Sequence, residues 1–75
     1  MNNGKRELLR KSLTMVGGAI ELVSGVLYDE RDALDNIPEN LSGSERYQMM
    51  ETAIDNLENA IDYLRDASEE IGETI

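Results

Sequence analysis

Apolar residues in the first half of the chain recur at alternating spacings of four and three residues. This is the spacing of positions a and d in a coiled coil, and it runs without a break for nearly three heptads. The row consists of Leu9, Leu13, Val16, Ile20, Val23 and Leu27. The pattern predicts an amphipathic helix over residues 5–36, preceded by a disordered N-terminus at residues 1–4.

Two further apolar rows lie beside this one, each repeating every seven residues. One row holds Leu8, Met15 and Leu22, and the other holds Ala19, Val26 and Ala33. The combined stripe is wider than the seam between two helices requires. We therefore expect the first helix to contact more than one neighbour and to form the centre of a self-association interface.

Gly17, Gly18 and Gly25 lie inside the same predicted helix. Each costs up to about 1 kcal/mol relative to alanine in a helix interior. Gly18 and Gly25 share a heptad position, which would let another backbone come close. A locally weakened or kinked helix explains the glycines equally well.

The first helix should end near Asn36, because Pro38 disfavours helical backbone at the residue before it. A connector is predicted at residues 37–43, where turn-forming residues are frequent. Two signals for the next helix remain open. Either Ser42 forms a capping box with Glu45, or Ser44 is the N-cap.

A second row of positions a and d predicts a helix over residues 44–72. Its members are Tyr47, Met50, Ile54, Leu57, Ile61, Leu64, Ser68 and Ile71. Ala53, Ala60 and Ala67 flank this row at heptad intervals. Small side chains beside large ones permit close packing between helices.

The chain of 75 residues forms one domain, predicted at residues 5–72. A domain this small usually needs disulfides, a metal or oligomerisation, and the chain has neither Cys nor His. We therefore expect an all-α antiparallel two-helix hairpin that assembles into a homo-oligomer, most simply a four-helix bundle of two copies. The expected interface comprises Leu9, Leu13, Val16, Gly18, Ile20, Val23, Gly25, Val26, Leu27, Ile54, Leu57, Ile61 and Leu64.

The net charge of −9 is distributed unevenly along the chain. Residues 1–28 carry +2, whereas residues 29–75 carry three arginines against 14 acidic side chains, or −11. Such a surface repels nucleic acid and attracts a basic partner protein, although a solubilising role is the simpler reading. No apolar run reaches the length of a membrane span and no signal-peptide core follows Met1, so we expect a cytoplasmic protein.

Nothing in the sequence indicates catalysis or a cofactor. Ser and Thr have no His to act as a base, and the inward positions are aliphatic rather than metal-binding. Glu30 is the one charged residue on the main seam of the first helix, and it either reaches water or pairs with Arg31 or Arg46.

Two clusters are candidate sites for an anionic ligand such as a nucleotide. Near the connector, aromatic and basic residues would stack on a base and hold a phosphate. This cluster contains Tyr28, Arg31, Arg46 and Tyr47. The N-terminal basic patch contains Lys5, Arg6, Arg10 and Lys11. Each cluster also has a simpler explanation. The first cluster would hold the end of the hairpin together by packing, and the basic patch would form ion pairs with Glu69, Glu70 and Glu73.

A resemblance to a known group of proteins rests on three segments of the chain. They are the connector from Asp35 to Leu41, the following Ser44-Glu45-Arg46-Tyr47 and the Ala-Ile-Asp heptads. Over roughly residues 28–67 the chain resembles small uncharacterised acidic helical-hairpin proteins of Gram-positive bacteria and their phages. The resemblance implies a phage-type setting, in which such proteins often act by blocking or sequestering host defence components. It transfers no functional residue.

Three functions follow as hypotheses. The first is a non-enzymatic binding protein that acts stoichiometrically, with a counter-defence inhibitor as the narrower form. The second is a sponge for an anionic nucleotide signal at an oligomer interface. The third is a purely structural coiled-coil assembly part.

Overall fold

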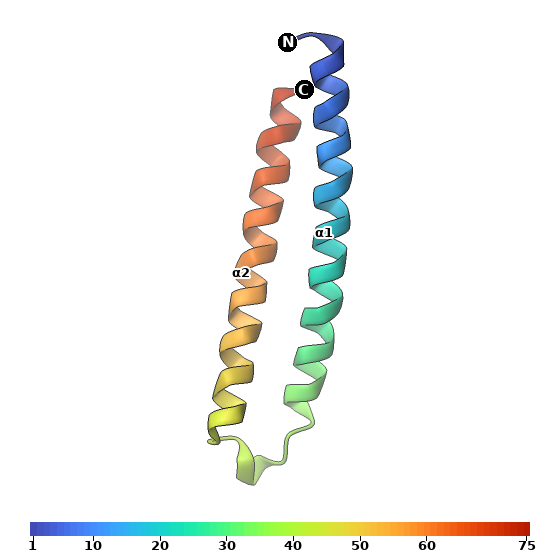
Figure 1. Ribbon diagram of the computed structural model, residues 1–75. Coiled ribbons are helices and arrows are strands. Elements are labelled where there is room, and N and C mark those ends of the chain that lie inside the picture. Colours follow the sequence, from blue (N-terminus) through green and yellow to red (C-terminus); the bar gives the residue numbers. More distant parts are fainter.

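Two long helices lie side by side in opposite directions and are joined by a short connector (Figure 1). The computed structural model describes all 75 residues. Helix α1 spans Asn3–Asp35, the 3-10 turn η1 spans Glu39–Leu41, and helix α2 spans Glu45–Thr74. Both termini lie at one end of the hairpin and the connector forms the other end (Figure 1). The prediction of an all-α hairpin is confirmed.

Helix α1 begins at Asn3 rather than at Lys5, so residues 1–4 are not the disordered segment that we expected. The cause is Asn2, whose side-chain oxygen accepts a hydrogen bond from the backbone N–H of Lys5 at 2.8 Å. This bond satisfies one of the four N–H groups that a helix start leaves without partners. Asn2 is therefore the N-cap of α1, a role that the apolar pattern does not reveal.

At the other end of α1, Asn36 terminates the helix. Its backbone N–H and its side-chain amide both donate to the carbonyl oxygen of Asp32, at 3.2 and 2.9 Å. Pro38 then has ψ of 142°, an extended conformation that directs the chain into η1. The connector therefore begins where the restriction before proline predicts.

The start of α2 settles the choice between its two predicted signals. Ser44 has extended backbone, and its hydroxyl accepts a hydrogen bond from the N–H of Tyr47 at 3.2 Å. The Ser42 hydroxyl instead donates to the carbonyl of Glu39 inside the connector, at 2.8 Å. Ser44 is therefore the N-cap, and α2 continues to Thr74, beyond the predicted end at residue 72.

The glycines of α1 neither break the helix nor allow a close approach within the chain. The helix is continuous through Gly17, Gly18 and Gly25, and no glycine has a positive φ. A Cβ atom added at any of the three would meet nothing within 4 Å. Within one hairpin, these glycines thus lower helix stability without a compensating contact.

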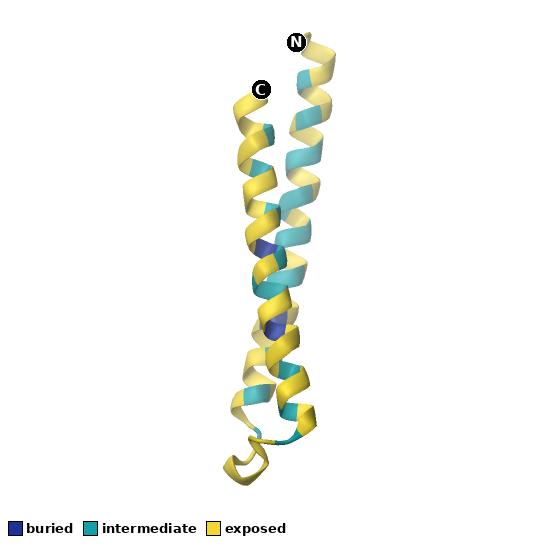
Figure 2. Cartoon of the chain, turned by 90° about the vertical axis from the view of Figure 1, so that its left-hand side faces the viewer, coloured by how far each residue is buried: buried dark blue, intermediate teal, exposed yellow.

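The residues predicted at positions a and d form the seam between the helices. Three of them are buried, namely Leu27, Ile54 and Ile61, with 5–7% of their surface exposed. Ile20, Val23, Leu34 and Leu57 are partly buried and pack against them. Figure 2 shows that buried and half-buried residues are confined to the line where the helices meet, and that the outer surfaces are exposed.

The hairpin is elongated and its core is small. It measures 60 × 15 × 13 Å, and its radius of gyration is 17.3 Å, whereas a compact chain of this length would have about 11 Å. Only three of 75 residues are buried and no side chain is fully enclosed. A single stripe on each helix is thus the only apolar surface that the hairpin covers.

The cap assignment predicts different effects for two neighbouring serines. Replacing Ser44 by Ala should lower the free energy of unfolding by about 1 kcal/mol, because the N–H of Tyr47 loses its acceptor. The matched control Ser42→Ala removes a solvent-exposed bond in the connector and should change stability by less than half as much. Urea denaturation measures both, and the reverse order would show that Ser42 caps the helix.

Gly25 provides a second prediction. Gly25→Ala should raise the free energy of unfolding by about 1 kcal/mol, because alanine restricts the unfolded chain and its methyl group enters open space. Gly18→Ala should act in the same way. Thermal and urea unfolding measure the change. A destabilised variant would instead mean that another backbone lies against this position.

Candidate functional site

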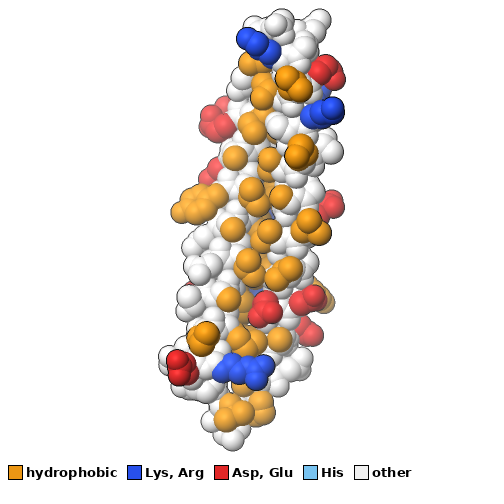
Figure 3. Space-filling view, in the orientation of Figure 1, with side chains coloured by type: hydrophobic (Ala, Val, Ile, Leu, Met, Phe, Trp, Pro, Cys, Tyr) orange, Lys and Arg blue, Asp and Glu red, His pale blue; other side chains and the backbone are white.

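The seam divides the hairpin into two long faces with different chemistry. On one face, Arg31 of α1 forms an ion pair with Glu58 of α2 across the seam. On the opposite face, hydrophobic side chains form a band along the junction of the helices for most of its length (Figure 3). The heptad rows that flank the seam explain this division, because residues seven apart point in nearly the same direction.

We call the hydrophobic side the apolar face. Alanines and Val26 line its centre, next to the seam, and larger side chains lie farther out on both helices. The central residues are Ala19, Val26 and Ala33 of α1 with Ala53, Ala60 and Ala67 of α2, and the outer ones are Leu8, Met15, Leu22, Met49 and Tyr63. The five outer side chains are 66–76% exposed and Val26 is 53% exposed. No part of the chain covers this face.

The expected interface residues separate into two groups. Those at positions a and d lie in the seam inside one hairpin, so they hold the two helices together and have little surface left for another copy. They are Leu9, Leu13, Val16, Ile20, Val23, Leu27, Ile54, Leu57, Ile61 and Leu64. Val26 lies on the apolar face, whereas Gly18 and Gly25 are exposed farther from the seam.

The face opposite the apolar face carries a shallow polar groove. Its walls come from the middle of both helices, and its charged residues are Arg31, Glu58, Asp62 and Arg65, beside Tyr28. Arg31 is paired with Glu58, whereas Arg65 has no ion pair. Two cations and two anions balance, so the groove offers no strong field for an anion. Glu58, Asp62 and Arg65 were not predicted as residues of a site. The seven-residue spacing of Glu58 and Arg65 nevertheless places both on one side of α2.

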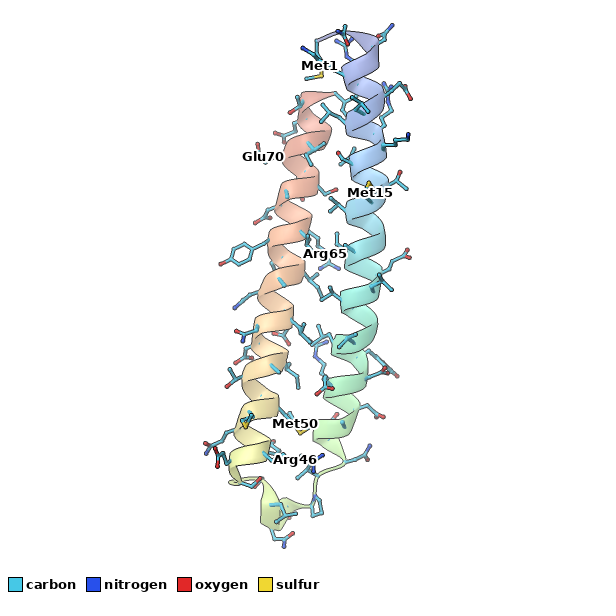
Figure 4. The ribbon with its side chains drawn as sticks, viewed as in Figure 1. Met1, Met15, Arg46, Met50, Arg65 and Glu70 are labelled. Carbon is cyan, nitrogen blue, oxygen red and sulfur yellow. The ribbon has the colours of Figure 1, made fainter.

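The four residues expected to form a nucleotide site near the connector do not come together. Tyr28 and Arg31 line the polar groove, whereas Arg46 lines a different hollow with Glu30, Met49 and Met50. Figure 4 shows Arg46 and Met50 between the helices near the connector, well below Arg65. Tyr47 is half-buried and lines neither hollow. The expected cluster is therefore not formed.

Three of the four cations of the N-terminal basic patch make no ion pair, and none pairs with α2. Arg10 pairs with Glu7 in the same helix, and Arg6 donates to the side chain of Asn3 at 3.4 Å. The expected ion pairs with Glu69, Glu70 and Glu73 are absent, since the chain holds only the Arg10–Glu7 and Arg31–Glu58 pairs. Figure 4 shows why for Glu70, which points away from α1.

Glu30 is half-buried and forms no ion pair with Arg31 or Arg46, so it is not the buried pair considered as an alternative. No three acidic side chains gather in a geometry that would hold a metal ion. Neither helix contains a stretch that is long and apolar enough to cross a membrane.

Comparison with known proteins adds no relative. The chain matches no protein-family model, and no curated protein and no solved structure shows significant similarity to it.

The Arg31–Glu58 ion pair is the only one that links the helices, and its strength is testable. The two side chains are 53% and 43% exposed, so a double-mutant cycle with Arg31→Ala and Glu58→Ala should give a coupling below about 1 kcal/mol. Added salt should reduce it further. A coupling above about 2 kcal/mol would contradict an exposed pair and would place this face in a desolvated interface.

Proposed function

We propose that the protein is a non-enzymatic binding protein that works as a homo-oligomeric helical bundle, most simply a four-helix bundle of two hairpins. The uncovered apolar face is the observation that carries this proposal. Its exposed leucines, methionines and valine form one continuous surface beside a core of only three buried residues. Contiguous apolar surface on a small protein marks an interaction site.

The outer surface of such a bundle is acidic. Residues 29–75 carry −11, and the acidic side chains Asp55, Asp62 and Glu69 repeat every seven residues along α2. All three are exposed and none forms an ion pair. This charge supports stoichiometric binding to a partner with a basic surface.

The narrower role is a phage-type counter-defence inhibitor that blocks or sequesters a host component in the cytoplasm. Its support is the resemblance of the connector and the heptads, together with the acidic surface. The nucleotide sponge keeps only the N-terminal basic patch as its site, because its four connector residues lie at separate places. A purely structural assembly part differs from the proposed function only in having no further partner.

Acid neutralisation tests the proposed function. The triple variant Asp55→Asn, Asp62→Asn, Glu69→Gln should keep its helix content and its oligomeric mass, because these side chains make no ion pairs. It should lose at least ~10-fold in affinity for a partner that the unmodified protein recovers from host lysate at low salt. Titration with the purified partner measures the change. Glu21→Gln serves as a control, because it removes an exposed acid that also makes no ion pair but lies outside residues 29–75.

Two results would contradict the proposal. If the unmodified protein recovers only itself at low salt, stoichiometric binding to a basic partner is excluded. If light scattering gives the mass of one 8.4 kDa chain at every concentration, the oligomeric bundle is excluded as well.

A further inference from the structure

We propose that a second copy of the chain covers the apolar face as a two-fold dimer in which the hairpins are antiparallel. We call this orientation head-to-tail, because the connector of each hairpin lies beside the termini of its partner. This inference rests on the proposed function, for which it names the interface and the order of the two copies. Three observations carry it, namely the surplus of exposed surface, the composition of the apolar face and the distribution of charge along the hairpin.

The exposed area matches what a dimer needs to cover. The hairpin exposes 5737 Å², whereas a compact chain of 8.4 kDa exposes roughly 4,600 Å². The surplus is about 1,100 Å², and each partner in a standard protein interface contributes about 800 Å². One additional copy is therefore enough to bring the exposed area per chain into the ordinary range.

The composition of the apolar face suits contact with itself. Apart from Arg46, which lines a hollow with Met49, Met50 and Ala53 at the connector end, the central residues are small and uncharged. Two such faces can approach closely, and the leucines and methionines at the edges then lie against the neighbouring backbone. A two-fold dimer requires one patch that complements itself. An anionic membrane is a poor occupant, because the chain carries −9 and lacks the lysine-rich border of membrane-surface helices.

Charge decides the order of the two copies. The connector end, residues 29–51, carries seven acidic side chains against two arginines, or −5, while the end that holds both termini, residues 1–14 and 62–75, carries five cations against six acidic side chains, or −1. Two hairpins in the same orientation would bring both connector ends together within a Debye length of about 8 Å. In the opposite orientation, each connector end lies beside the nearly neutral end of its partner, where Lys5, Arg6 and Lys11 make no ion pair in the hairpin.

Two exposed side chains of α1 provide a matched test of the face. Leu22 on the apolar face is 76% exposed and Tyr28 on the opposite face is 74% exposed. Leu22→Glu should raise the dimer dissociation constant by at least ~100-fold, because the lost burial and the new charge occur twice in the interface. Tyr28→Glu should change it by less than ~3-fold.

Sedimentation equilibrium measures both constants, and circular dichroism at the same concentrations reports whether each variant is folded. A dimer that tolerates Leu22→Glu but dissociates with Tyr28→Glu would place the interface on the polar groove and overturn the inference. The oligomer of the proposed function would survive that result.

Distances between spin labels test the orientation, and the absence of cysteine makes each introduced label unique. Asn40→Cys places a label in the connector. In a head-to-tail dimer the two labels should be separated by about the 60 Å length of the hairpin, and in a parallel dimer by at most about 30 Å, which is twice its 15 Å width. Asn59→Cys, near the middle of α2, is the matched control and should give a short distance in both arrangements.

A short Asn40 distance would overturn the head-to-tail order while leaving the dimer intact. No dipolar coupling at Asn59, together with the mass of a single chain, would overturn the dimer and with it the oligomeric part of the proposed function. A defined coupling at Asn59 with a long Asn40 distance is the result that the inference requires.

Discussion

A two-helix hairpin buries only the stripe along which its helices touch, and this limit determines the rest of the structure. The seam of this chain is regular, yet it encloses only Leu27, Ile54 and Ile61. Ordering a backbone residue costs about 1–2 kcal/mol, so long helices need extensive apolar burial to be stable. The hairpin has the apolar side chains for more burial, but they lie on a face with no neighbour. The proposed assembly of two copies would cover these side chains.

The two faces of the hairpin differ in composition, and this difference is related to the limited burial in the seam. Small residues beside the seam leave the apolar face open to a second helical surface, and the opposite face carries the Arg31–Glu58 pair and the balanced charges of the polar groove. Charge is segregated along the molecule as well. The connector end carries −5 and the end that holds both termini carries only −1, which would give a second copy a preferred direction (Figure 1). In the proposed dimer, burial favours association and charge sets the relative direction of the two copies.

The sequence was sufficient for the fold because heptad spacing reports helix faces directly. The row from Leu9 to Leu27 and the row from Tyr47 to Ile71 were both predicted, and both lie in the seam. The exact helix ends were harder to predict from the sequence. Asn2 as the cap of α1 needed the geometry of its side chain, and the choice between Ser42 and Ser44 depended on which hydroxyl meets the N–H of Tyr47.

The candidate sites were predicted less well than the fold, because they depend on contacts between helices. Sequence proximity to the connector grouped Tyr28, Arg31 and Arg46, but the rotation of each helix places Arg46 away from the other two. The interface was assigned mainly to positions a and d, which one hairpin already uses. The apolar rows of Leu8, Met15 and Leu22 were recognised as surplus, and they are the residues that remain exposed. A partner outside the chain leaves no periodic pattern that identifies it.

If a second copy covers the apolar face, folding and self-association of this chain should be coupled. Thermal unfolding followed by circular dichroism over a 100-fold range of protein concentration tests this most directly. Tm should rise with concentration, because association of folded chains stabilises the folded state by mass action. A Tm that stays constant over the whole range, with full helix content at the lowest concentration, would contradict it.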